Sequence, residues 1–120
     1  MGYELRVVRE APLAFAELAK AIAPAGFGLR GSDEIVAGHA GGTHVVGHWR
    51  DQVIGEPGSD WQVAQLIRLA AALGARLVGE DNENYAVRDG IVELVVDDGT
   101  VVKIGKYHEI IEAGPNAWSP

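Results

Sequence analysis

The sequence predicts a small α+β protein in which helices pack on one face of a mainly antiparallel sheet. Its 120 residues suit a single domain, residues 1–120. Two segments repeat apolar residues at helical spacing, and several shorter ones have the composition of strands. The expected order is β-α-β-β-α-β plus a C-terminal hairpin, folded as a two-layer sandwich. A ferredoxin-like split βαβ plan is one arrangement that satisfies this order, and other α/β sandwiches satisfy it too.

The N-terminal third of the chain predicts a strand, a helix and a glycine-rich loop. Residues 3–9 (YELRVVR) alternate between two faces, as a half-buried strand does. Pro12 suits the first position of a helix because its missing N–H has no intrahelical partner there, and apolar residues recur at helical spacing over 12–23. Residues 24–42 contain many glycines around one apolar run, so we expect a loop with a short strand at 34–37.

The middle of the chain predicts a hairpin followed by the best-defined helix. Residues 43–49 and 52–56 read as two strands joined at Arg50-Asp51. Ser59 is an expected N-cap, with Gln62 three residues later as in a capping box. Gly74 supplies the C-terminal cap. The apolar stripe of this helix consists of Val63, Leu66, Ile67, Ala70 and Leu73.

The C-terminal part predicts further strands separated by polar turns. Residues 76–79 and 85–88 read as strands on either side of a polar turn at 80–84. Another hairpin is expected to join 91–96 and 100–104 through Asp97-Asp98-Gly99, because Asp-Gly favours tight turns. The segment 106–120 shows weak periodicity, and we expect it to be an irregular tail.

The composition limits the classes of partner. The formal net charge is −7, which argues against direct binding to nucleic acid, because phosphate contacts need clustered Lys and Arg. An acidic surface can attract a basic protein, although acidity also serves solubility alone. Without cysteine, disulfides and thiolate metal sites are excluded. The charged segment 1–10 and the absence of an apolar run of roughly 20 residues predict a cytoplasmic protein without membrane contact.

Three patterns that can mark a cofactor or catalytic site have structural explanations. Gly26, Gly28 and Gly31 match G-x-G-x-x-G, but they follow a helix instead of opening one, so we interpret them as a connection. His44 and His48 lie on a predicted strand, where about 3.3 Å per residue separates them by roughly 13 Å, too far to share a metal. The serines are not in a nucleophile elbow, and Ser59 is explained as a cap; the others are Ser32 and Ser119. We therefore expect no cofactor, no metal and no catalytic residue.

The acidic turn is the candidate partner-binding surface. Glu80, Asp81 and Glu83 precede Tyr85, and Trp61 lies near the start of the second helix. Trp and Tyr are enriched at interface hot spots, so a charged rim beside an aromatic anchor is typical of a protein interface. The alternative is a solvated turn, with Trp61 as a half-buried lid on the sheet.

The segment from Val45 to Tyr85 also carries a resemblance. It contains a Trp-ending strand, a short strand, an apolar helix with a Leu-Gly-Ala end, and an acidic turn before a tyrosine. In this it resembles a group of small, largely uncharacterised bacterial proteins. The matching positions are Ala71, Leu73, Gly74, Ala75, Leu77, Gly79, Glu80, Asp81 and Tyr85.

Proteins of this size and charge are often immunity partners of polymorphic or contact-dependent bacterial toxins, so the resemblance implies an inhibitory protein-binding role. It brings no catalytic residue with it. The chain departs from the group in its glycine-rich segment 26–42 and in its C-terminal hairpin and tail.

Three functional hypotheses follow. The preferred one is an immunity-type inhibitor that covers the cleft of a cationic toxin domain with its acidic face and performs no chemistry. The second is a small-molecule-binding regulatory module, by analogy with ferredoxin-like sheets. The third is a small enzyme that uses His44 or His48 with a carboxylate from elsewhere in the fold. The sequence leaves self-association through an exposed strand edge open.

Overall fold

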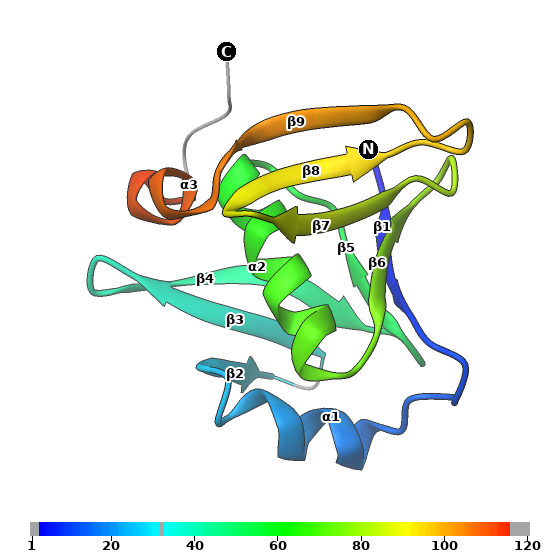
Figure 1. Cartoon of the computed structure of the whole chain (residues 1–120). Coiled ribbons are helices and arrows are strands. Elements are labelled where there is room, and N and C mark those ends of the chain that lie inside the picture. Colours follow the sequence, from blue (N-terminus) through cyan, green and yellow to red (C-terminus); the bar gives the residue numbers. More distant parts are fainter. Residues whose placement is uncertain (1–2, 32, 116–120) are drawn as a thin grey trace.

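The computed structural model describes residues 3–31 and 33–115. Within them the protein is α+β, with three helices and one sheet of nine antiparallel strands, which confirms the predicted class (Figure 1). The sheet order is β2-β3-β4-β5-β1-β6-β7-β8-β9. In chain order the elements are β1 (Leu5–Val8), α1 (Phe15–Ile22), β2 (Phe27–Arg30), β3 (Glu34–His39), β4 (Gly42–Trp49), β5 (Val53–Gly55), α2 (Asp60–Ala72), β6 (Arg76–Gly79), β7 (Asn84–Arg88), β8 (Ile91–Val95), β9 (Val101–Lys106) and α3 (Tyr107–Ala113).

The observed order differs from the predicted β-α-β-β-α-β order with its C-terminal hairpin. The described residues form more strands than that order contains, and a third helix, α3, occupies residues 107–113 at the start of the expected irregular tail. Strand β1 lies in the middle of the sheet and pairs antiparallel with both β5 and β6. The ferredoxin-like layout is therefore not confirmed.

Within the glycine-rich segment 24–42, β2 pairs with β3 in an antiparallel hairpin, where the sequence predicts a loop with one short strand. Gly26 and Gly31 flank β2 with φ of +89° and +64°, a region that residues with a Cβ rarely adopt. These two glycines let the chain turn into and out of the strand. Between them Phe27 is buried in the core, which anchors the strand.

Helix α1 begins at Phe15, later than the Pro12 start that the sequence predicts. Arg9 explains the delay, because its Nε and Nη2 donate to the carbonyl oxygens of Ala11 and Pro12, at 2.9 and 3.3 Å. In a helix beginning at Pro12, these carbonyls would accept hydrogen bonds from residues 15 and 16. The arginine holds them outside the helix and also contacts Glu17 on the first turn of α1.

The predicted caps of α2 are confirmed. Ser59 Oγ accepts a hydrogen bond from the Gln62 backbone N–H at 3.3 Å. At the other end Gly74 has φ +64°, and Ala75 N–H donates to the carbonyl of Ala70 at 2.9 Å, the pattern of a Schellman motif. Gln62 Nε2 also donates to the carbonyl of Val45 at 2.9 Å, which fixes the start of the helix to β4.

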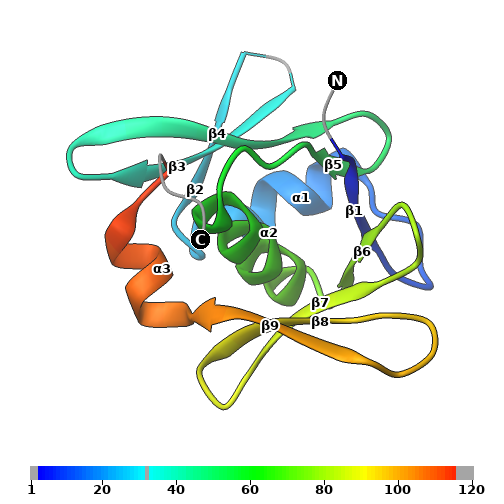
Figure 2. The same ribbon diagram turned by 90° about the horizontal axis from the view of Figure 1, so that it is seen from above.

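The sheet curves around α2, and α3 lies across the remaining side (Figure 2). α2 packs against β1, β4, β6 and β7 and against both other helices. Trp61, Leu66 and Leu69 are fully buried, and buried residues occur around most of the helix and not in one stripe. A helix that is apolar on most sides belongs in a core. Thus α2 is the central element of the molecule and not one of two helices covering an open face.

Two glycines allow α2 to approach the sheet closely. A Cβ on Gly55 of β5 would lie 2.5 Å from Leu66 Cδ1 and 3.1 Å from the carbonyl oxygen of Val46. On Gly47 of β4 it would lie 3.1 Å from the carbonyl of Ile54. The side chain of Leu66 therefore sits where side chains of β4 and β5 would otherwise project.

None of the helices formed by residues 3–31 and 33–115 is long and apolar enough to span a membrane.

The variant Gly55→Ala should lower the free energy of unfolding by about 1–3 kcal/mol, because the added methyl group forces Leu66 out of its position. Gly28→Ala is the matched control. It also lies in a strand, but there the new Cβ would make an ordinary 3.5 Å contact with Val36. Urea denaturation of both variants measures the difference, and equal stability of the two would show that this close approach is not a packing constraint.

Candidate functional site

The turn between β6 and β7 is built around a reversal at Gly79–Glu83. Asn82 N–H donates to the carbonyl of Gly79 at 3.1 Å, and Gly79 N–H donates to the carbonyl of Glu83 at 2.9 Å. Asn82 has φ +62°, a conformation that asparagine tolerates better than most residues. The turn leaves Glu80 and Asp81 exposed to solvent but directs Glu83 inward.

Glu83 is a buried carboxylate with several hydrogen-bond donors. Its Oε2 accepts from the hydroxyl groups of Tyr3 at 2.5 Å and Tyr85 at 2.8 Å. Its Oε1 accepts from the backbone N–H of Asp81 at 3.1 Å. A Cβ on Gly79 would clash with this carboxylate, so a larger residue at position 79 would displace the Glu83 side chain. These contacts join the N-terminal segment to β7 through a single charged group.

The same hydrogen bonds govern ionisation in this cluster. Burial raises the pKa of Glu83, but the bonds from Tyr3, Tyr85 and the backbone outweigh it and leave the pKa below its usual value. Burial and the bond to Glu83 raise the pKa of Tyr3 to about 12. The same two causes raise the pKa of Tyr85 even further above its usual value. At neutral pH the cluster therefore holds one carboxylate and two neutral phenols.

A second acidic turn, between β8 and β9, lies beside the first. Strands β7 and β8 are antiparallel, with Asn84 opposite Val95, so the turn before β7 and the turn after β8 lie at the same end of the sheet (Figure 1). Together they form a hollow of about 340 Å³. Its lining residues are the acidic Asp81, Glu83, Asp97 and Asp98 and the apolar Leu94 and Val96. We call these six residues the acidic hollow.

The acidic hollow contains some of the predicted site residues and excludes others. Asp81 and Glu83 line it, and Glu80 lies on the same turn with its carboxylate accepting a hydrogen bond from Glu4 N–H at 2.6 Å. Tyr85 is half-buried and is connected to the acidic hollow by the hydrogen bond from its hydroxyl group to Glu83. Trp61 is only 1% exposed, so the structure places it in the core, where its side chain does not reach the surface.

Asp97 and Asp98 were not singled out from the sequence. The Asp-Gly pair predicted their turn, and Gly99 does adopt φ +90° there. Asp98 also accepts a hydrogen bond from Thr100 N–H at 2.8 Å, which fixes the turn, whereas Asp97 is exposed to solvent. Their proximity to Asp81 depends on the pairing of β7 with β8, which residue spacing alone does not reveal.

The two histidines of β4 face different partners. The His44 ring contacts Trp61 edge-on at a centroid distance of 5.8 Å, and His39 contacts the same indole at 6.0 Å. His48 Nε2 lies 4.0 Å from Glu34 Oε2 on β3. Within residues 3–31 and 33–115, no group of three or more His, Cys, Asp or Glu side chains could hold a metal ion.

The serines give a similar result. Ser59 is fully buried as the cap of α2. Ser32 and Ser119 lie outside the described residues.

No protein-family model matches the chain, and no curated protein and no solved structure shows significant similarity to it.

The ionisation of Tyr3 tests the Glu83 cluster. Because the folded-state pKa of Tyr3 is raised, its contribution to stability is present below the unfolded value of about 10 and is lost as the pH rises through about 12. The difference in tyrosinate absorbance between wild type and Tyr3→Phe isolates this one hydroxyl. It should titrate near 12 in the native background and move down toward about 10 when Glu83→Gln removes the charged acceptor.

Circular dichroism recorded at each pH establishes that the chain is still folded. A native Tyr3 titration near the ordinary tyrosine value would show that its hydroxyl does not bond to the Glu83 carboxylate in solution.

Proposed function

We propose that this chain is a non-catalytic protein-binding module, an immunity-type inhibitor that neutralises a basic bacterial toxin domain through its acidic hollow. The observation that carries the proposal is the convergence of two acidic turns on one concave surface. The toxin domain would be blocked because the inhibitor covers its cationic cleft, and this requires no chemistry from the chain.

The division of roles among the acidic residues supports this proposal. Glu83 is buried and accepts hydrogen bonds from both tyrosine hydroxyl groups, so it shapes the hollow and contributes a fixed negative charge. Asp81 and Asp97 are exposed, and a partner's Lys or Arg can approach them directly. No Lys or Arg is among the described lining residues, so the charge of the hollow is not neutralised from within.

The apolar part of the hollow supports a protein partner over a free cation. Leu94 and Val96 line it together with the carboxylates. The long side chains of Lys and Arg combine an apolar stem with a charged end, so they complement a surface of this kind. The excess negative charge of the whole chain, −7, would also accelerate the encounter with a basic partner at low salt.

Charge reversal tests the surface. The double variant Asp81→Lys, Asp97→Lys alters the hollow, and Glu10→Lys, Glu112→Lys makes the same change in net charge at exposed residues outside its lining. Each protein is immobilised and exposed to a lysate of the cells from which the gene comes. Wild type and control should retain the same basic protein, with less at high salt, and the hollow variant should lose it.

The retained protein is then expressed alone and together with each variant. It should arrest bacterial growth, and wild type should restore growth where the hollow variant does not. Equal retention by the hollow variant would exclude this surface. A captured protein that is harmless when expressed alone would contradict the inhibitor function.

A further inference from the structure

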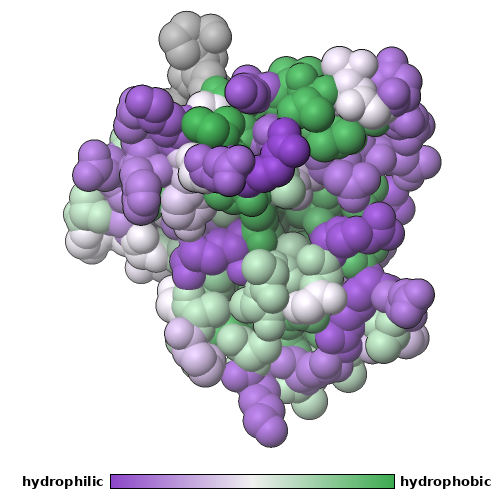
Figure 3. Space-filling view, in the orientation of Figure 1, coloured by the Kyte–Doolittle hydropathy of each residue, from purple (hydrophilic) through white to green (hydrophobic). Residues whose placement is uncertain are grey.

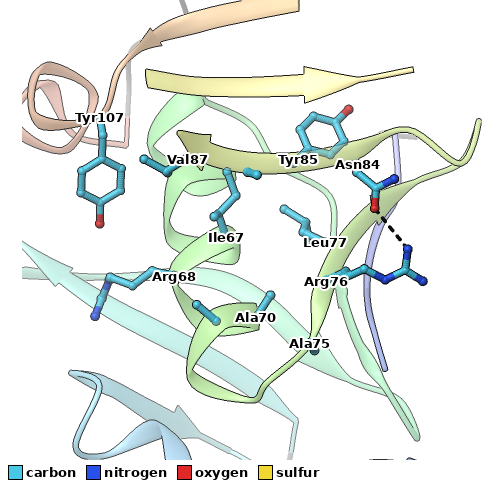
Figure 4. A pocket seen from close by; sticks show the side chains of 12 residues that line it. Ile67, Arg68, Ala70, Ala75, Arg76, Leu77, Asn84, Tyr85, Val87 and Tyr107 are labelled. Atoms are coloured by element: carbon cyan, nitrogen blue, oxygen red, sulfur yellow. Dashed lines mark hydrogen bonds between the residues drawn. The ribbon is translucent and has the colours of Figure 1, made fainter. Parts of the chain in front are cut away.

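A second concave surface, of different chemistry, lies between α2 and the β6–β7 hairpin. It is a groove of about 570 Å³, within the range of about 300–1,000 Å³ that small-molecule sites occupy. Figure 3 shows it as a recess with hydrophobic residues inside and polar residues around it. Ile67 comes from α2, Leu77 from β6 and Val87 from β7 (Figure 4). Ala71 of α2 also lines it. We call this surface the apolar groove.

The charges at the apolar groove are opposite in sign to those of the chain. Arg68 and Arg76 are among its lining residues, and no Asp or Glu is among those described. In a chain with 17 acidic residues against 10 basic ones, such a surface favours an anion. The groove and the acidic hollow therefore select ligands of opposite charge.

The two arginines differ in how far their donors are used. Arg68 Nε and Nη2 donate to Gln65 Oε1 at 3.0 and 2.7 Å, and its Nη1 donates to the carbonyl of Ala25. Its guanidinium also lies 4.2 Å from the centre of the Phe27 ring. Arg68 is thus fixed by the fold and contributes its charge but few free donors.

Arg76 keeps most of its donors. It is exposed at one end of the groove, and its hydrogen bond with a described residue is a long one, 3.5 Å from Nη1 to Asn84 Oδ1. Tyr107 of α3 stands at the opposite end (Figure 4). The groove consequently has an apolar middle and a cation beside one end. The Arg76 guanidinium extends past β6 toward Asn84 (Figure 4), and rotation of this exposed side chain would bring its N–H groups to the mouth of the groove.

We propose that the apolar groove binds a small amphipathic carboxylate, with its apolar body against Ile67, Ala71 and Val87 and its carboxylate on Arg76. A guanidinium can donate two parallel hydrogen bonds to a carboxylate, which fixes the orientation of the ligand. Burial of the apolar body supplies the remaining binding energy. This ligand site is separate from the acidic hollow and does not depend on the proposed inhibitor function.

Decanoate is the probe, and decanol, with the same chain length and no charge, is the matched ligand control. Isothermal titration calorimetry on the full chain should detect decanoate binding and weaker binding of decanol. Arg76→Gln should weaken decanoate binding about fivefold, because the ion pair lies at the surface. Arg30→Gln removes the same kind of charge from β2, outside the groove lining, and should leave the affinity unchanged.

Ala71→Trp keeps the test decisive. Ala71 is exposed, so a larger side chain fills the groove without disturbing the core. This variant should abolish decanoate binding while its thermal unfolding remains close to that of wild type. Decanoate binding that survives Ala71→Trp, or that is the same as decanol binding and insensitive to Arg76→Gln, would overturn the proposal.

A second copy of the chain could also occupy the apolar groove. Light scattering on the same samples distinguishes such a dimer from a monomer that binds decanoate. If the groove were a dimer interface, Ala71→Trp would change the oligomeric state, and decanoate would fail to bind the wild-type dimer. That pair of results would also overturn the carboxylate site.

Discussion

The burial of α2 within the curve of the sheet is the constraint on which the rest of the structure depends. Among the described residues, the two halves of the sheet, β2–β5 and β6–β9, are joined in hydrogen bonding through β1 alone. Helix α2 connects the halves in the chain and packs against strands of both. The helix approaches Gly47 and Gly55 closely, and this places Leu66 in the core. Helix α2, which lies within the curve of the sheet, provides most of the cover for the sheet's apolar face.

Both candidate binding surfaces follow from this arrangement. The β6–β7 hairpin begins immediately after the glycine cap of α2, so its strands form one wall of the apolar groove while its turn contributes to the acidic hollow. Tyr85 lines the groove, and its hydroxyl donates a hydrogen bond to Glu83 of the acidic hollow. Burying the Glu83 carboxylate costs solvation energy, which its hydrogen bonds offset. This charge is structural, whereas Asp81 and Asp97 are exposed to solvent.

The sequence predicted features that depend on local chemistry. The caps of α2 at Ser59 and Gly74, the strand at 76–79 and the Asp-Gly hairpin are each encoded within a few residues, and the structure has them. The central position of β1 depends on pairing with strands about 50 and 70 residues away, which no local pattern records. The β2–β3 hairpin was missed because its glycines resemble a loop, although two of them supply the positive φ that its ends require.

At the candidate site, too, local sequence patterns did not predict features that depend on long-range packing. Glu80 and Asp81 were predicted as exposed charges and are exposed, but Glu83, two residues further on, is buried by its two tyrosine donors. Trp61 looked like a surface anchor because it stands at a helix start, yet the curve of the sheet encloses that end of α2. Whether a charged or aromatic residue is accessible was decided by packing over long sequence distances, and the sequence does not contain that information locally.

Native-state amide hydrogen exchange tests the central position of α2 most directly. The backbone amides in the middle of α2, around Leu66 and Leu69, should exchange only through global unfolding, with the same free energy that denaturant unfolding gives. Edge strands β2 and β9 should exchange faster through local opening. If the amides of α2 exchanged faster than those of β1 and β6, the helix would be a peripheral element, and its role as the centre of the fold would be contradicted.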